Sequence, residues 1–211
     1  MKLRTTAIVL LALLSACRTQ GDIVEGQGIY AIRSACPLVA IPAATGDITL
    51  FDPAGRSDAA ALDVTAAITN VRGNCQEDTA NIVSTATFDV VATRRDAGAA
   101  RQVILPYFNV VVRAGDVVVA KRLGNVALNF AAGSQRAQTS SQATVRIARA
   151  SATLPSEVRA QLTRRRKAGD PDAAIDPLSD PAIRTAVANA TFEQLIGFQL
   201  TQAQLQYNAT R

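Results

Sequence analysis

The chain of 211 residues contains no histidine and no tryptophan, and aromatic residues make up only 4% of it. Histidine is the usual general base, the commonest metal ligand and the side chain that titrates near neutral pH. Its absence excludes catalysis by Ser-His-Asp and Cys-His groups, and it excludes a histidine pH switch. For an enzyme with this sequence, carboxylates or tyrosines are the catalytic groups that we consider.

The first residues also lack a hydrophobic run long enough to cross a bilayer. Thr5–Leu14 is apolar, but a membrane-spanning helix needs roughly 20 such residues. Lys2 and Arg4 precede this run, and the small residue Ala16 precedes Cys17, as a signal-peptide cleavage site requires. The pattern predicts a signal peptide over residues 1–16. The alternative to a specific role for Cys17 is an ordinary secretory signal that the cysteine follows by coincidence.

The end of this segment, Leu14-Ser15-Ala16-Cys17, resembles the lipobox of bacterial lipoproteins. The resemblance implies diacylglycerol on the Cys17 sulfur, cleavage just before Cys17 and acylation of the new amine. More than one acyl chain is needed for stable anchoring, because each buried CH₂ contributes only about 0.8 kcal/mol. Arg18 stands where a lipoprotein of the inner membrane often carries aspartate. We therefore expect attachment to the outer membrane, facing the periplasm.

Removing 16 of the 211 residues leaves 195, enough for one domain with a proper core. The formal charge falls from +5 to +3 when Lys2 and Arg4 are lost. The mature chain is therefore only mildly basic, and this charge does not by itself indicate binding to nucleic acid. Hydrophobic residues make up 48% of the sequence and are mostly alanine and valine. Small and β-branched side chains favour a β-sheet core.

Two cysteines remain besides Cys17. Cys36 and Cys75 form an even pair in an oxidising compartment, so we expect one disulfide between them. In the chain-entropy model, closing this loop stabilises the fold by about 4 kcal/mol. The alternative, a redox-active pair, lacks the CxxC spacing of such sites.

Alternation of apolar and polar residues is the main signal in the first three quarters of the chain. It is clearest where Leu62, Val64, Ala66 and Ile68 alternate with polar or small residues. Strands are predicted at Cys36–Ile41, Ile48–Phe51, from Leu62 towards a turn at Gly73-Asn74-Cys75, Ile82–Thr93, Val103–Arg113, Val117–Arg122 continuing to Phe130, and Ala143–Arg149. Arg94–Gly98 is predicted to be an exposed loop, and Pro106 to lie at a bulge or an edge. Seven or eight strands at this spacing favour an all-β, immunoglobulin-like antiparallel sandwich.

After Thr153 the pattern changes to helical spacing. Helices are predicted at Pro155–Lys167 and Ala182–Ala190, the second with Asp180 as N-cap and Pro181 at its first position. A last strand is expected at Thr191–Leu200. Thr201 and Gln204 match a capping box before a short terminal helix that continues through Tyr207. The expected organisation is a lipidated tether at 17–33 with a first edge strand near Ile29–Ile32, then one domain at 34–211 with a helical insertion at 154–190.

The most specific signature is Gly197-Phe198-Gln199-Leu200-Thr201, followed by Gln204-Leu205 and Tyr207-Asn208. With Cys36-Pro37 and the lipobox, it resembles an uncharacterised family of Gram-negative envelope lipoproteins. The resemblance covers most of the mature chain, but it is close only at those motifs and loose elsewhere. It implies a location in the cell envelope and supports the predicted sandwich fold. It implies no particular activity.

Five cations gather in the predicted insertion: Arg159, Arg164, Arg165, Arg166 and Lys167. They form a candidate patch for an anionic partner, such as lipopolysaccharide phosphate, anionic lipid or an acidic protein. The alternative is a solvated helix end, where the macrodipole favours cations. No aromatic residues interleave the cluster, so stacking on nucleic acid is not expected.

Acids and tyrosines give weaker signals. Asp170, Asp172, Asp176 and Asp180 do not have the spacing of a calcium-binding EF-hand loop, and their Asp-Pro pairs are typical of turns and caps. Tyr207 and Asn208 either form a recognition tip or close the end of the sandwich. Tyr30 and Tyr107 are expected to be strand aromatics. We expect no metal and no cofactor.

The sequence therefore favours a non-enzymatic, lipid-anchored envelope module that binds or scaffolds another envelope component. Addition of a partner strand to an exposed sheet edge would be the natural mode for such a fold. Two alternatives stay open: a carrier of an apolar ligand between the sheets, and an enzyme acting on cell-wall or lipid material.

Overall fold

The structure is a computed structural model, and it describes residues 34–167 and 169–210. Cys17, Tyr30 and the edge strand expected near Ile29–Ile32 lie outside the described residues. The described elements are β1 (Leu38–Ala40), β2 (Asp47–Phe51), the 3₁₀ turn η1 (Ala59–Ala61), β3 (Leu62–Glu77), β4 (Asn81–Arg94), β5 (Arg101–Arg113), β6 (Val117–Phe130), β7 (Arg136–Ala148), α1 (Arg149–Ala152), α2 (Ser156–Thr163), the 3₁₀ turn η2 (Pro177–Ser179), α3 (Pro181–Asn189), β8 (Phe192–Phe198) and α4 (Gln202–Thr210).

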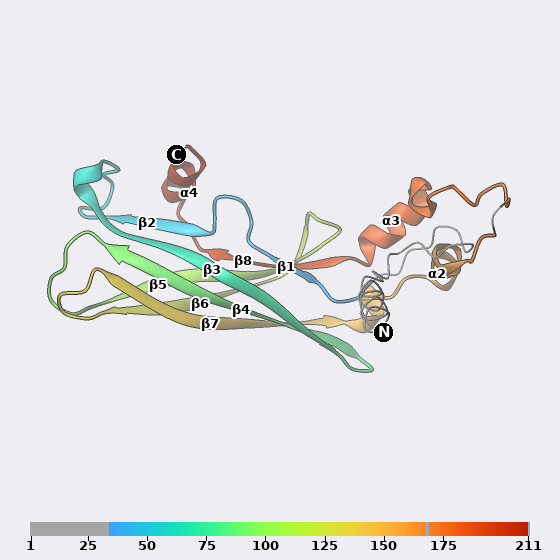
Figure 1. Ribbon diagram of the computed structural model, residues 1–211, viewed down its shortest axis with the longest axis horizontal. Coiled ribbons are helices and arrows are strands. Elements are labelled where there is room, and N and C mark those ends of the chain that lie inside the picture. Colours follow the sequence, from blue (N-terminus) through green and yellow to red (C-terminus); the bar gives the residue numbers. More distant parts are fainter. Residues whose placement is uncertain (1–33, 168, 211) are drawn as a thin grey trace, which may run out of the picture. The chain divides into compact units, whose positions relative to one another are not determined.

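The strands form two sheets of four strands each (Figure 1). One has the order β2-β3-β4-β7 and is antiparallel throughout. The other has the order β1-β8-β5-β6, in which β1 runs parallel to β8 and the remaining pairs are antiparallel. The mostly β architecture predicted from the alternating pattern is confirmed.

The two sheets share one hydrophobic core. The alternating residues Val64, Ala66 and Ile68 of β3 point inward, as predicted. The largest fully buried side chains include Phe88 from one sheet and Phe198 from the other. Because both sheets contribute to this cluster, the arrangement is that of a β-sandwich.

The sandwich unit has two ends that differ in structure. The hairpin end contains the β3–β4 turn at residues 78–80 and the start of α1, where the Arg149 N–H donates to the Ala80 carbonyl oxygen (2.9 Å). The loop end contains the connections at 52–61, 95–100 and 131–135. The sandwich unit comprises residues 34–154 and 185 onward, whereas residues 155–184 belong to a second compact unit that carries α2, η2 and the first turn of α3.

The predicted turn at Gly73-Asn74-Cys75 is wrong. β3 continues through these residues to Glu77, and its pairing with β4 is unbroken from Arg72 onward. Gly73 is needed for a close approach rather than for a turn, because a Cβ atom there would lie 2.7 Å from a methyl carbon of Val39. The real irregularity is a register shift between Thr69 and Arg72, where Asn70 has a positive φ of 51°.

Pro106 was predicted to lie at a bulge or an edge, but β5 is an internal strand of its sheet and its register shift falls between Val111 and Val112. Pro106 lies instead where the pairing of β5 with β8 ends. The Gln199 N–H donates to the Pro106 carbonyl oxygen (2.9 Å), so the proline directs its carbonyl group and its hydrogen-free nitrogen to the β8 side. β8 ends at Phe198, opposite Tyr107. From Pro106 back to Arg101, β6 is therefore the only strand paired with β5 among the described residues.

A buried polar network joins the sheets. The Gln194 Nε2 group donates to the Asn109 side-chain oxygen (3.1 Å) and to the Ala143 carbonyl oxygen (2.9 Å). The Gln194 Oε1 atom accepts a hydrogen bond from the Ser84 hydroxyl (2.7 Å). Each polar atom of the Gln194 side chain has a partner, so its complete burial is compatible with a stable core.

The helix caps follow the sequence. The Asp180 carboxylate accepts from the Ala182 N–H (2.7 Å), next to Pro181 at the first position of α3. At α4, the Gln204 side chain accepts from the Thr201 N–H (2.9 Å) and the Thr201 hydroxyl accepts from the Gln204 N–H (3.3 Å). Both the predicted cap and the predicted capping box are confirmed.

Candidate functional site

The predicted disulfide is present. Cys36 and Cys75 are joined with a Cα–Cα distance of 6.0 Å, so the segment before β1 is bonded to β3 in the other sheet. This bond braces the hairpin end and leaves no thiol for redox chemistry among the described residues. The lipidation site, Cys17, lies outside them.

The five cations of the predicted anionic-partner patch have different surroundings. α2 ends at Thr163, so Arg164, Arg165, Arg166 and Lys167 follow the helix rather than lie on it. The Asp172 carboxylate forms ion pairs with both Arg164 and Arg166. The Arg166 side chain is only 7% exposed, whereas Arg159, Arg165 and Lys167 are exposed. One carboxylate thus offsets part of the charge that the sequence placed in this cluster.

The neighbouring aspartates accept backbone hydrogen bonds in turns and at helix starts, which is the role that the Asp-Pro pairs indicated. Asp176 accepts from the Leu178 N–H (2.9 Å) at the start of η2, and Asp170 accepts from the Lys167 N–H (2.8 Å). In the described ranges 34–167 and 169–210, no group of three or more cysteines or acids is arranged to hold a metal ion.

The described tyrosines contact phenylalanines. Tyr107 packs edge-on against Phe88 with ring centroids 5.3 Å apart, and its ring lies over Gly124 of β6, where a Cβ atom would lie 2.5 Å from the ring. Tyr207 of α4 packs edge-on against Phe51 of β2, also at 5.3 Å. The Asn208 Nδ2 group donates to the carbonyl oxygens of Ala44 (3.0 Å) and Asp47 (2.8 Å). These contacts hold α4 beside β2 (Figure 1).

The loop end is a candidate site that the sequence did not reveal. The predicted exposed loop is found at residues 95–98, but the prediction is wrong for Arg94, which is the last residue of β4 and is buried. Its guanidinium donates hydrogen bonds to four backbone carbonyl oxygens from the connections 95–100 and 131–135, at 2.7 to 3.1 Å: those of Ser134, Ala99, Gly98 and Ala131. The same group lies 5.3 Å from the centre of the Phe130 ring. Arg94 therefore ties two connections together.

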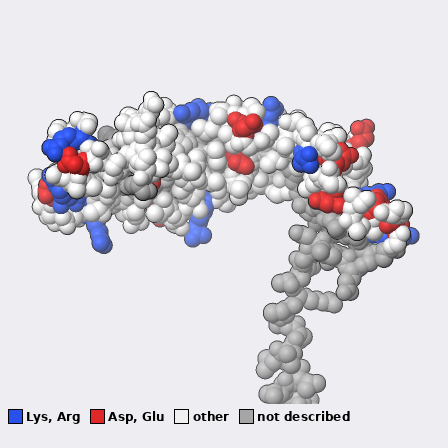
Figure 2. Space-filling model, turned by 90° about the horizontal axis from the view of Figure 1, so that it is seen from above, with Lys and Arg blue, Asp and Glu red and all other residues white. Residues whose placement is uncertain are grey.

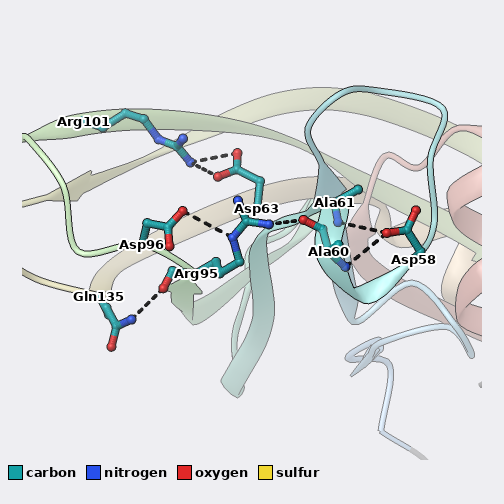
Figure 3. A network of polar contacts seen from close by, with 8 residues as sticks. All are labelled: Asp58, Ala60, Ala61, Asp63, Arg95, Asp96, Arg101 and Gln135. Atoms are coloured by element: carbon teal, nitrogen blue, oxygen red, sulfur yellow. Dashed lines mark hydrogen bonds and ion pairs between the residues drawn. The ribbon is translucent and has the colours of Figure 1, made fainter.

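Three further arginines at this end form ion pairs with carboxylates. Arg56 pairs with Asp58 (2.7 Å), Arg95 with Asp96 (3.2 Å), and Arg101 with Asp63 (2.9 Å). Figure 3 shows how the network continues: Arg95 also donates to the Ala60 carbonyl oxygen, and the Asp58 carboxylate caps η1 through the N–H groups of Ala60 and Ala61. In Figure 2, acidic and basic side chains lie side by side at this end of the sandwich, on the left.

Two clefts open at the loop end. The larger has a volume of about 1060 Å³ and lies between the β2–β3 connection and α4, with Phe51, Tyr207 and Gln204 in its walls. The smaller, of about 350 Å³, is lined by residues 94–96 and 98–101. Asp52 and Asp63 line both clefts. The larger cleft has a volume close to the upper limit, about 1,000 Å³, of small-molecule sites in proteins.

A second candidate surface is the first half of β6, residues 117–123, which we call the β6 edge. β6 is the last strand of its sheet, and all of residues 117–123 are exposed. Val126, Leu128 and Phe130, which come later in the same strand, are buried. Large apolar side chains are among the exposed ones: Val118 is 60% exposed and Leu123 is 65% exposed.

No protein-family model matches the chain, and the comparisons with curated proteins and with solved structures found no similar protein. Within the part of the chain that the structure describes, none of the helices has the length and apolar character needed to cross a bilayer. The loop end and the β6 edge are therefore the two places whose geometry can indicate a function.

Proposed function

We propose that this protein is a lipid-anchored binding module of the bacterial outer membrane that takes up an extended segment of another envelope protein at the β6 edge. In this proposal it is attached through Cys17, has an immunoglobulin-like sandwich and carries out no chemical reaction. The observation that carries it is the exposure of β6 residues 117–123 on both faces of a strand that has, within the described residues, no neighbour on one side. Strand addition at an open edge is a common mode of peptide recognition.

The hydrogen-bonding groups of the β6 edge follow from its register. Pro106 pairs with Asn125, and Pro106 directs its carbonyl group away from β6, towards β8. In an antiparallel pair, Asn125 must then also direct its N–H and C=O groups away from β5. Because successive residues alternate, Leu123 and Lys121 do the same. These two residues offer backbone donors and acceptors to an added strand.

The side chains indicate the chemistry of the partner. Leu123 and Lys121 lie on the same face of β6, and the Lys121 ammonium lies 5.7 Å from the centre of the Phe108 ring. Arg122 adds a second exposed cation on the opposite face. Since described residues 117–123 contain no acid, an extended segment that alternates apolar and acidic residues would complement this edge.

A substitution at one residue separates strand addition from ordinary surface contact. Leu123→Pro removes an N–H that points to the free edge and leaves the hydrogen bonds with β5 in place, whereas Leu123→Ala removes the side chain and keeps that N–H. A photocrosslinking residue at Val118 of the lipidated protein in cells is expected to capture one defined envelope protein. Capture should persist with Leu123→Ala and be lost with Leu123→Pro.

The controls decide the outcome. A crosslinker at Gln142, exposed on β7 in the other sheet, should not give the same product. Equal capture from both positions, capture that survives Leu123→Pro, or a product that consists of two copies of this chain would each contradict the proposal. The anchor is checked in the same cells, because Cys17→Ala should release the protein from the membrane fraction, and retention there would refute lipid attachment.

A further inference from the structure

The larger cleft at the loop end lies between two walls, each of which is attached to the sandwich. α4 is held by its capping box, by the hydrogen bonds of Asn208 and by the contact of Tyr207 with Phe51. The opposite wall, residues 52–57, is held where the Asp52 N–H donates to the Ala61 carbonyl oxygen (2.8 Å). The cleft is therefore organised before any ligand arrives, which lowers the entropic cost of binding.

The lining combines an apolar side with a charged end. Leu50, Phe51, Ala54, Ala203 and Tyr207 supply apolar and aromatic surface. Asp52 and Asp63 supply two carboxylates where the larger cleft meets the smaller one, and Arg56 also lines the larger cleft. A ligand that fills both parts needs an apolar body and a polar head group.

The ion pairs of the loop end show which of its charged side chains are already paired, and so which charge a bound head group would need. Arg56, Arg95 and Arg101 are each paired with a carboxylate: Asp58, Asp96 and Asp63, respectively. Arg94 directs its guanidinium to four carbonyl oxygens. Among the described charged residues that line the two clefts, Asp52 is the one whose side chain has no hydrogen bond or ion pair, so its carboxylate is the charge in the clefts that is left for a ligand.

We infer that the cleft between residues 49–57 and α4 binds an organic cation, an amine with an apolar body, whose ammonium group pairs with Asp52 and whose body lies against Phe51 and Tyr207. A carboxylate beside aromatic rings is suited to such a ligand, because rings attract cations through their faces and bury hydrocarbon. An anionic head group would meet Asp52 as a like charge. This site is separate from the β6 edge and does not depend on strand addition there.

A series of probes with one body and three head groups tests the inference: hexylamine, 1-hexanol and hexanoate, titrated at pH 7 into the purified full chain and followed by backbone NMR signals. Hexylamine is protonated at this pH, as lysine is. It should shift the signals of Ala54, Ala203 and Tyr207 and bind about fivefold more tightly than 1-hexanol, the advantage that one exposed ion pair gives. Hexanoate should bind most weakly.

Three variants make the test specific. Asp52→Asn should remove the advantage of hexylamine over 1-hexanol, whereas Asp96→Asn, which changes a carboxylate outside the larger cleft, should leave it. Ala203→Phe should fill the cleft and weaken all three probes, and the same spectra report whether each variant is folded. The inference is overturned if the probes shift no cleft signals, or if hexylamine keeps its advantage in Asp52→Asn.

Discussion

The two ends of the sandwich are held by different kinds of interaction. At the hairpin end, the Cys36–Cys75 disulfide joins the two sheets covalently. At the loop end, the buried Arg94 guanidinium joins the connections 95–100 and 131–135, and the Arg101–Asp63 ion pair joins the starts of β5 and β3. A covalent brace fixes one arrangement once it has formed in an oxidising compartment, whereas hydrogen bonds and ion pairs can exchange with those of a ligand. The position of two clefts with charged linings at the loop end is consistent with this difference.

Removing the covalent brace should have the largest effect. The double variant Cys36→Ser, Cys75→Ser opens a loop with a sequence separation of 39 and should lower the free energy of unfolding by about 4 kcal/mol, because the unfolded chain regains loop entropy. Urea denaturation of the variant and of the oxidised and reduced parent protein measures this. The reduced parent protein should match the variant, and equal stability of all three forms would show that the bond contributes nothing.

Removing the buried guanidinium of Arg94 at the loop end should have the next largest effect. Arg94→Met keeps much of the aliphatic volume but removes the charged donor shared by four partly buried carbonyl oxygens, so we expect a loss of about 3 kcal/mol. The matched control is Arg95→Met, whose side chain is exposed and should contribute less than about 1 kcal/mol. If both variants lose the same small amount, Arg94 does not hold the connections together.

The sequence predicted what local patterns determine. Alternation placed β4 and the first part of β3, and the caps at Asp180 and Thr201 placed the starts of α3 and α4, because each of these signals depends on residues within a few positions of one another. The disulfide was predicted from cysteine number and compartment alone.

Interactions between distant segments could not be predicted in this way. Gly73 was interpreted as a turn residue, but its lack of a side chain makes room for Val39 of another strand. Arg94 stands in a polar run that is typical of exposed loops, and its burial depends on carbonyl groups from a connection about 40 residues further on. The cleft likewise needs α4 to return beside β2, and no short motif encodes that contact.

The smallest expected effect concerns acid at the hairpin end. The N–H groups of Asn81 (2.6 Å) and Ala80 (2.7 Å) donate to the Asp78 carboxylate and hold its pKa below the ordinary value. Because the folded pKa is lowered, the contribution of the ionised group is present above the unfolded value of about 3.9 and is lost as the pH falls through the folded pKa.

The turn at 78–80 should therefore open more readily below about pH 4, whereas the loop end should not respond to this group. Hydrogen-exchange protection of the Ala80 and Asn81 amides, corrected for the intrinsic pH dependence of exchange, should fall between pH 5 and pH 2. In Asp78→Asn, which has no carboxylate to protonate, protection should be lower at pH 5 and change little on acidification. A parallel fall in the variant would show that another group controls the turn. Because Asp78 is fully exposed, we expect a change confined to this hairpin and no measurable shift in global unfolding.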